Sequence, residues 1–167
     1  MSKNTRFLTH AAVIAALYAV LTHLQNVLLP GSTTWAIQMR LSEALCVLSF
    51  FTPAAIPGLT VGCLVFNITY AAALPLDFLV GSLATLLAAG GMWLTRRVTV
   101  KGYPLLGMAM PALFNALLVG WELTVYIGDT FALNAVYVAI GEVTVLLILG
   151  SVLFFALRKR HLEQKLF

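Results

Sequence analysis

The chain has 167 residues, of which 61% are hydrophobic and only 10% charged, with a formal net charge of +4. About one quarter of the residues in an ordinary soluble chain are charged. A soluble domain of this size could not hide so much apolar surface, because too few polar residues would remain to cover it. This composition excludes a soluble protein and predicts an all-α integral membrane protein. Its basic residues flank apolar runs instead of forming a stripe with interleaved aromatics, which argues against nucleic-acid binding.

Six apolar segments follow one another along the chain, each ended by proline, glycine or a polar connector. A membrane-crossing helix needs about 20 apolar residues, and the longest stretch is interrupted by TPAAIPG, so it is divided into two shorter helices. The predicted helices cover residues 7–29, 44–56, 58–74, 77–95, 104–127 and 133–157. No linker separates a second domain, so residues 1–167 are predicted to form one compact bundle of six transmembrane helices.

The basic residues provide an independent check on this count, because they cluster in three groups. The groups are Lys3 and Arg6; Arg96, Arg97 and Lys101; and Arg158, Lys159, Arg160 and Lys165. With six crossings and a cytoplasmic N-terminus, all three groups and the C-terminus face the cytoplasm, as the positive-inside rule expects. Arg40 is then the one exception among the ten Lys and Arg residues.

The first predicted helix carries a stripe of small residues. The stretch HAAVIAALYAV places Ala11, Ala15 and Ala19 four residues apart, with Ala12 and Ala16 beside them. Small residues at this spacing let another helix approach closely. The stripe therefore indicates either ordinary packing within the bundle or a docking face for a partner protein.

Polar residues gather at the outer start of the second and fourth helices. The stretch QMRLSEAL contributes Gln38, Arg40 and Glu43, and ALPLD contributes Asp77. Ionisable groups inside a membrane are costly, so they indicate a functional site. Two structural alternatives remain: Arg40 and Glu43 could pair with each other, and Asp77 could cap its helix.

The last two helices supply the strongest candidates, Glu122 and Glu142, because no Lys or Arg lies inside the same helices. Asn115 lies seven residues before Glu122, on one helix face, and Asn134 and Tyr137 lie near the side of Glu142. We expect these groups to form an outward-facing pocket for a flat, hydrogen-bonding, cationic ligand. Alternatively, the asparagines could join neighbouring helices and Tyr137 could serve packing alone.

Four stretches of the chain resemble the QueT family, one of the substrate-binding S components of energy-coupling factor (ECF) transporters. They are QMRLSEALCVLSFFTPAAIPGLTVGCLVFN, LPLDFLVGSLATLLAA, NALLVGWEL and NAVYVAIGE. The resemblance implies uptake of a queuosine precursor, a 7-deazaguanine such as preQ1 or queuine, across the plasma membrane of a prokaryote. The deazaguanine would bind near the outer surface, where Glu122, Glu142 and Glu43 suit its N–H face and its cation.

The resemblance also implies partners. An S component associates with a transmembrane coupling protein and two ATPase subunits, which use the ATP, and it binds no cofactor itself. The alanine pattern of the superfamily matches Ala12 and Ala16, or the overlapping Ala11 and Ala15. Absence of a P-loop motif agrees with ATP hydrolysis by the partners.

Three other functions remain as alternatives to this assignment. The chain could be an S component for another vitamin-like solute, or a secondary transporter, although 167 residues are few for two repeats. It could also be an intramembrane enzyme with Glu122 and Glu142 as an acid–base pair. The sequence contains no HExxH motif or metal-ligand spacing, and Cys46 and Cys63 fit packing roles, so a non-enzymatic protein is expected.

Overall fold

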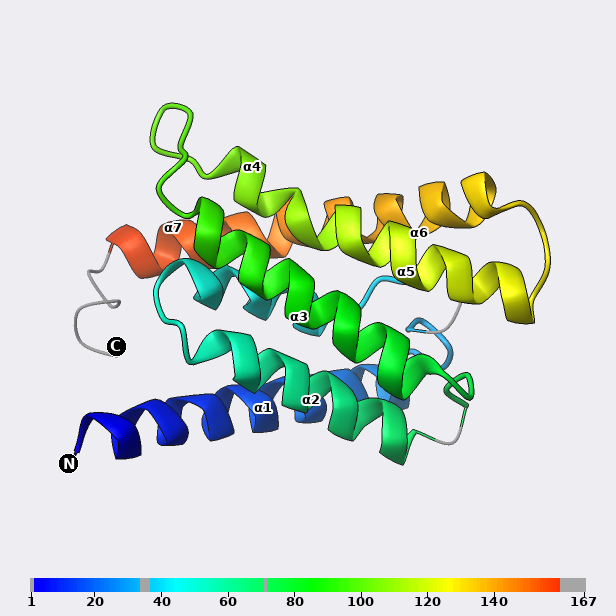
Figure 1. Cartoon of the computed structure of the whole chain (residues 1–167), viewed down its shortest axis with the longest axis horizontal. Helices are drawn as coiled ribbons and strands as arrows, with labels where there is room; N and C mark the ends of the chain where they lie inside the picture. Colours follow the sequence, from blue (N-terminus) through cyan, green and yellow to red (C-terminus); the bar gives the residue numbers. More distant parts are fainter. Residues whose placement is uncertain (1, 34–36, 71, 160–167) are drawn as a thin grey trace.

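The computed structural model describes residues 2–33, 37–70 and 72–159, and every regular element in them is helical (Figure 1). The elements are α1 (Lys3–Leu28), η1 (Leu41–Phe50), α2 (Ala55–Thr69), α3 (Asp77–Thr95), α4 (Leu105–Met108), α5 (Met110–Tyr126), α6 (Phe131–Val145), η2 (Leu146–Gly150) and α7 (Ser151–Lys159). Of these, η1 is a 3₁₀ helix and η2 is a short π-helical segment. The all-helical prediction is therefore confirmed for the described residues.

The elements occupy the six predicted segments and alternate in direction along the bundle (Figure 1). α4 continues into α5, and α6 continues through η2 into α7, so each of these groups forms one rod. The second segment differs most from its predicted range of 44–56, because η1 ends at Phe50 and α2 begins at Ala55. Pro57 lies in the first turn of α2, where a missing N–H costs nothing, so it does not break the helix.

Within the described ranges, four helical stretches are long and apolar enough to cross a membrane: Lys3–Leu28, Asp77–Thr95, Leu105–Tyr126 and Phe131–Lys159. The other two are short. With 10 residues at about 2.0 Å each, η1 extends roughly 20 Å, and the 15 residues of α2 extend roughly 22 Å. Both lengths fall below the hydrocarbon core of about 30 Å, so length alone supports four crossings, not the six predicted.

The short helix η1 lies at the centre of the bundle. It packs against α1, α2, α3, α6, η2 and α7, and eight of its ten residues are buried. The core around it includes Val47 and Phe50 from η1, Leu59 from α2 and Met92 from α3. Because η1 is surrounded, Ser42 and Glu43 near its start are buried inside the protein.

The two ends of the bundle differ in charge. The N-terminus, the end of α7 and the connection between α3 and α4 lie at one end (Figure 1). The described basic residues there are Lys3, Arg6, Arg96, Arg97, Lys101, Arg158 and Lys159. Arg158 donates to the backbone carbonyl of Gly102, which joins α7 to that connection. Arg160, Lys165 and Ala71, which the sequence analysis assigned to a basic cluster and a helix, lie outside the described residues.

Close contact between α1 and α2 depends on two glycines of α2. A Cβ atom on Gly58 would lie 2.7 Å from the carbonyl oxygen of Ala11, and one on Gly62 would lie 2.7 Å from that of Ala15. Real Cβ atoms do not approach so closely, so each site needs glycine. Ala11 and Ala15, the inward half of the alanine stripe, therefore serve packing within the bundle.

The outward half of the alanine stripe has a different environment. Ala12 and Ala16 are exposed on α1, whereas Ala19 is buried. Large apolar side chains such as Leu8 and Val20 are also exposed on this helix. Of the two overlapping alanine pairs, Ala12 and Ala16 are thus the pair that remains available on the outer surface of α1.

We predict that Gly62→Ala destabilises the protein by about 1–3 kcal/mol, the usual cost of overpacking. The new methyl group would press on Ala15 and also on Tyr18, whose Cβ would lie 2.7 Å away. Gly90→Ala in α3 is the matched control, because a Cβ there meets no atom within 4 Å. Thermal unfolding in detergent should show a lower midpoint for Gly62→Ala alone; equal midpoints would contradict the close contact.

Candidate functional site

Buried ionisable groups gather around the start of η1, in the half of the bundle away from the basic end. They are Arg40, Glu43, Asp77, Glu122 and Glu142, each no more than 6% exposed. They come from the start of η1 and from α3, α5 and α6, which are separate in sequence but packed together. The structure thus brings most of the predicted site residues into one region.

Arg40 forms the one ion pair found among the described residues. Its Nη2 lies 3.5 Å from Oδ2 of Asp77, the first residue of α3. Its Nε donates to the carbonyl oxygen of Thr33 at 3.4 Å, and its guanidinium lies over the ring of Phe66, 5.8 Å from the centroid. The pairing of Arg40 with Glu43 that the sequence left open is therefore not the one observed, and Asp77 serves mainly as its partner.

Glu43 has donors of its own. The hydroxyl of Tyr18 on α1 donates to Oε1, and the thiol of Cys46 lies 3.1 Å from Oε2. One turn further along α1, the hydroxyls of Thr22 and Ser42 lie 2.7 Å apart. These contacts tie η1 to α1 and hold the Glu43 side chain in place.

Glu142 and Asn115 form the polar wall between α5 and α6. Nδ2 of Asn115 donates to Oε1 of Glu142 at 2.8 Å, whereas Oε2 of Glu142 has no hydrogen-bond partner among the described residues. The two side chains line a cavity of about 10 Å³. Its other walls are Gln38, Arg40, Glu43, Val119 and Val138. A space of this size holds about one water molecule, so a larger ligand requires the walls to separate.

Glu122 does not line this cavity, although Arg40, which does, is near it. Glu122 is fully buried at 0% exposure, and neither of its carboxyl oxygens has a hydrogen-bond partner in the described part of the chain. Arg40 is within electrostatic range of both Glu122 and Glu142. The other charged neighbour is Asp77 for Glu122 but Glu43 for Glu142. The two glutamates therefore belong to one cluster but occupy different parts of it.

The backbone of Gln38 can lie close to α6 because the facing residue there, Gly141, has no side chain. A Cβ atom on Gly141 would collide with the backbone carbonyl of Gln38, so only glycine allows this approach. The neighbouring residue on α6 is Glu142, and Gln38 itself lines the cavity. Gln38 therefore forms part of the cavity wall next to α6.

Two predicted site residues lie elsewhere. Nδ2 of Asn134 donates to Oγ1 of Thr124 at 3.0 Å and to the carbonyl oxygen of Gly128 at 2.9 Å, so it ties the α5–α6 turn together. This is the interhelical role that the sequence left open. Tyr137 is half-buried on α6 and does not line the polar cavity.

Sequence reasoning missed two polar residues of the cluster, Tyr18 and Asn67. Tyr18 is fully buried and lies between alanines of the α1 stripe. Asn67 is buried on α2, and its Nδ2 donates to the backbone carbonyl of Asp77 at 2.8 Å, whereas its Oδ1 has no described partner. A polar group inside an apolar helix was the available signal for both.

Taken together, the cluster contains more acceptors than donors. Glu122 contributes two free carboxyl oxygens, Glu142 one, and Asn67 a free amide oxygen. Buried polar atoms without partners are rare, and each needs an explanation. A ligand with several N–H donors would satisfy them.

We predict that Arg40→Gln destabilises the protein by about 3–5 kcal/mol, because Asp77 would remain as a buried charge without a partner. Adding Asp77→Asn should restore part of that loss. Arg97→Gln, at an exposed arginine of the basic end, should change stability by no more than about 0.5 kcal/mol. Thermal unfolding of the four proteins in one detergent checks this; a similar loss for both arginines would refute the importance of the pair.

Comparisons with known proteins place this chain in a family. The model of the family described as QueT transporter matches residues 8–159. No curated protein matches the chain, and no solved structure matches it. The matched range contains all the helices except the first turns of α1, together with every charged residue of the buried cluster. The chain belongs to the QueT transporter family.

Proposed function

We propose that this chain is the substrate-binding S component of an ECF importer and that it takes up a queuosine precursor, a 7-deazaguanine such as preQ1 or queuine. The observation that carries the proposal is the buried cluster of unpaired acceptors around Glu122, Glu142 and Asn115. Membership in a transporter family supports a role in solute uptake. The chain acts by binding and not by catalysis in this proposal.

The Glu142–Asn115 pair is suited to a guanine-like edge. A carboxylate accepts from adjacent N–H groups, and an amide can both donate and accept. Val119 and Val138 supply apolar wall for a ring system, in the mixed lining typical of small-molecule sites. Because the cavity of about 10 Å³ is smaller than any bicyclic base, binding must move Gln38 and its neighbours away from α6.

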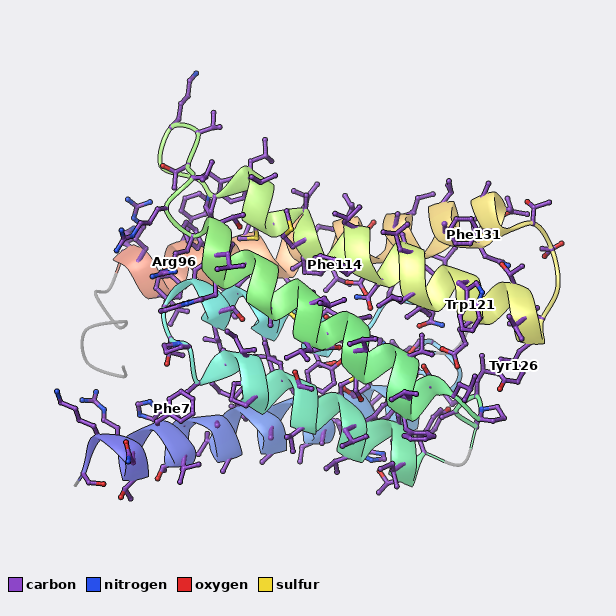
Figure 2. All side chains as sticks on the ribbon, in the orientation of Figure 1. Phe7, Arg96, Phe114, Trp121, Tyr126 and Phe131 are labelled. Carbon is purple, nitrogen blue, oxygen red and sulfur yellow. The ribbon has the colours of Figure 1, made fainter. Side chains whose placement is uncertain are left out.

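The orientation that we propose is six crossings with both termini in the cytoplasm of a prokaryote. The basic end then meets the cytoplasmic surface, in keeping with the positive-inside rule. Figure 2 shows Arg96 at that end and Trp121, Tyr126 and Phe131 towards the other, and these three aromatic side chains are exposed. Aromatic belts of this kind occur at membrane interfaces. The short helix η1 would lie inside the bundle, whereas α2 packs between α1 and α3 and exposes Val61, Val65 and Ile68.

Energy for transport comes from partners in this proposal. A transmembrane coupling protein docks on the exposed Ala12 and Ala16 of α1, and two ATPase subunits use ATP, so this chain binds no cofactor. The small side chains leave the backbone of α1 accessible to a second helix. The inward pair, Ala11 and Ala15, is already in contact with α2.

We predict that the purified protein binds a 7-deazaguanine and that Glu142→Gln weakens binding by about 1–2 kcal/mol, the scale of a lost hydrogen bond to a charged group. Calorimetry in detergent measures the affinity, with guanine as the comparison ligand. Asp129→Asn is the matched control, because Asp129 is an exposed acid in the α5–α6 turn. Equal affinities for wild type and Glu142→Gln would remove Glu142 from the site.

We also predict that Ala12→Trp or Ala16→Trp preserves ligand binding but impairs assembly with the coupling protein, because a bulky side chain keeps the second helix at a distance. Leu17→Trp is the control: Leu17 is exposed on α1 but points about 100° away from Ala16 and about 140° away from Ala12. Co-purification of the complex and uptake into cells report on docking. Normal uptake by both alanine variants would exclude this face as the docking surface.

A further inference from the structure

The buried cluster has an unbalanced charge. Four acidic residues, Glu43, Asp77, Glu122 and Glu142, surround one basic residue, Arg40, within the described part of the chain. If all four acids were ionised, the cluster would carry a net charge of −3 in a low-dielectric interior. Such an arrangement is expensive unless protons or a bound cation neutralise it.

The four acids differ in how well their oxygens are satisfied. Asp77 has the guanidinium of Arg40, and Glu43 has two donors in Tyr18 and Cys46. Glu142 has one donor. Glu122 has none for either oxygen, although it is 0% exposed. Of the four acids, Glu122 therefore receives the least stabilisation of its ionised form from the described residues.

Groups facing the cluster from the packed elements do not offer a second cation. The titratable and charged groups are Tyr18 on α1, Cys63 on α2, Arg40, Glu43 and Cys46 at η1, Asp77 on α3, Glu122 on α5 and Glu142 on α6. Arg40 is already engaged by Asp77. An isolated buried carboxyl group avoids the cost of ionisation by keeping its proton.

We propose that the cluster takes a ligand carrying a protonated amine, that the amine pairs with Glu122, and that pairing releases the proton held by Glu122 in the empty protein. The inference rests on the proposed function and specifies its ligand further. In the binding step, the O–H bond of the Glu122 carboxyl group breaks and its proton passes to solvent. The ammonium group keeps its own proton and pairs with the resulting carboxylate.

The positions of the two free glutamates fit an elongated ligand. Asn115, the partner of Glu142, and Glu122 are seven residues apart on one face of α5, about 10 Å along the helix axis. A flat ring can therefore lie against Glu142 and Asn115 while a short amine arm extends to Glu122. Release of a proton means that affinity for the amine ligand rises with pH, as long as the amine stays protonated.

Two ligands with the same ring test the proposal: 7-aminomethyl-7-deazaguanine, which is cationic, and 7-cyano-7-deazaguanine, which is neutral. Each is titrated into the purified full chain by calorimetry at one pH, in two buffers that differ in ionisation enthalpy. We expect the amine to bind about tenfold or more tightly than the nitrile, the scale of a charged hydrogen bond. We also expect the amine alone to release about one proton.

Variants assign the effect to its residue. Glu122→Gln should reduce the amine-to-nitrile affinity ratio about tenfold and abolish proton release. Binding of the nitrile and thermal unfolding show whether this isosteric variant is folded. Asp129→Asn, which removes an exposed acid near the same end of α5, should leave both affinities and the proton release as in wild type.

The outcomes separate this inference from the proposed function. If neither ligand binds the wild-type protein, the proposed function itself fails. If both bind with similar affinity, or the amine binds without releasing a proton, the deazaguanine function stands and the role of Glu122 is overturned. Unchanged discrimination in folded Glu122→Gln would overturn it as well.

Discussion

The guanidinium of Arg40 is the one basic group among the four buried acidic residues that the structure describes. It lies where η1 begins, and its ion pair with Asp77 joins that point to the start of α3. Lipid supplies no water to solvate a charge, so the pair must be satisfied within the bundle. Because Asp77 engages Arg40, the glutamates of α5 and α6 lie near its charge without a direct bond to it. Both oxygens of Glu122 and Oε2 of Glu142 have no hydrogen-bond partner among the described residues. The same interaction thus stabilises the fold and leaves the acceptors of the site free.

Glycines position the polar residues as much as polar contacts do. Gly62 lets α2 approach α1 next to Tyr18, whose hydroxyl supports Glu43, and Gly141 lets the backbone of Gln38 reach α6. In both places an absent side chain brings a hydrogen-bonding residue to the centre. This is a route to a precise site in a membrane bundle, where small residues govern how closely helices pack.

The sequence predicted the helices well because apolar length and Pro–Gly interruptions are local signals. Ionisable groups inside apolar segments are conspicuous in so apolar a chain, so the sequence also singled out five candidates that the structure buries: Arg40, Glu43, Asp77, Glu122 and Glu142. The hydrogen-bond and ion-pair partners of these residues could not be predicted from the sequence. Whether Arg40 pairs with Glu43, three residues away, or with Asp77 depends on how α3 packs against η1, which is a property of the whole bundle. The sequence also could not tell whether Asn134 binds a ligand or joins helices; its amide donates to the backbone of the α5–α6 turn.

The small volume of the polar cavity matters for the membrane around the protein. A space of about 10 Å³ holds about one water molecule and is too small for a file of them. A potential of 100 mV drives each elementary charge with about 2.3 kcal/mol, and an open polar shaft would dissipate it. Buried acids that enclose so little space do not form such a shaft at this point of the bundle.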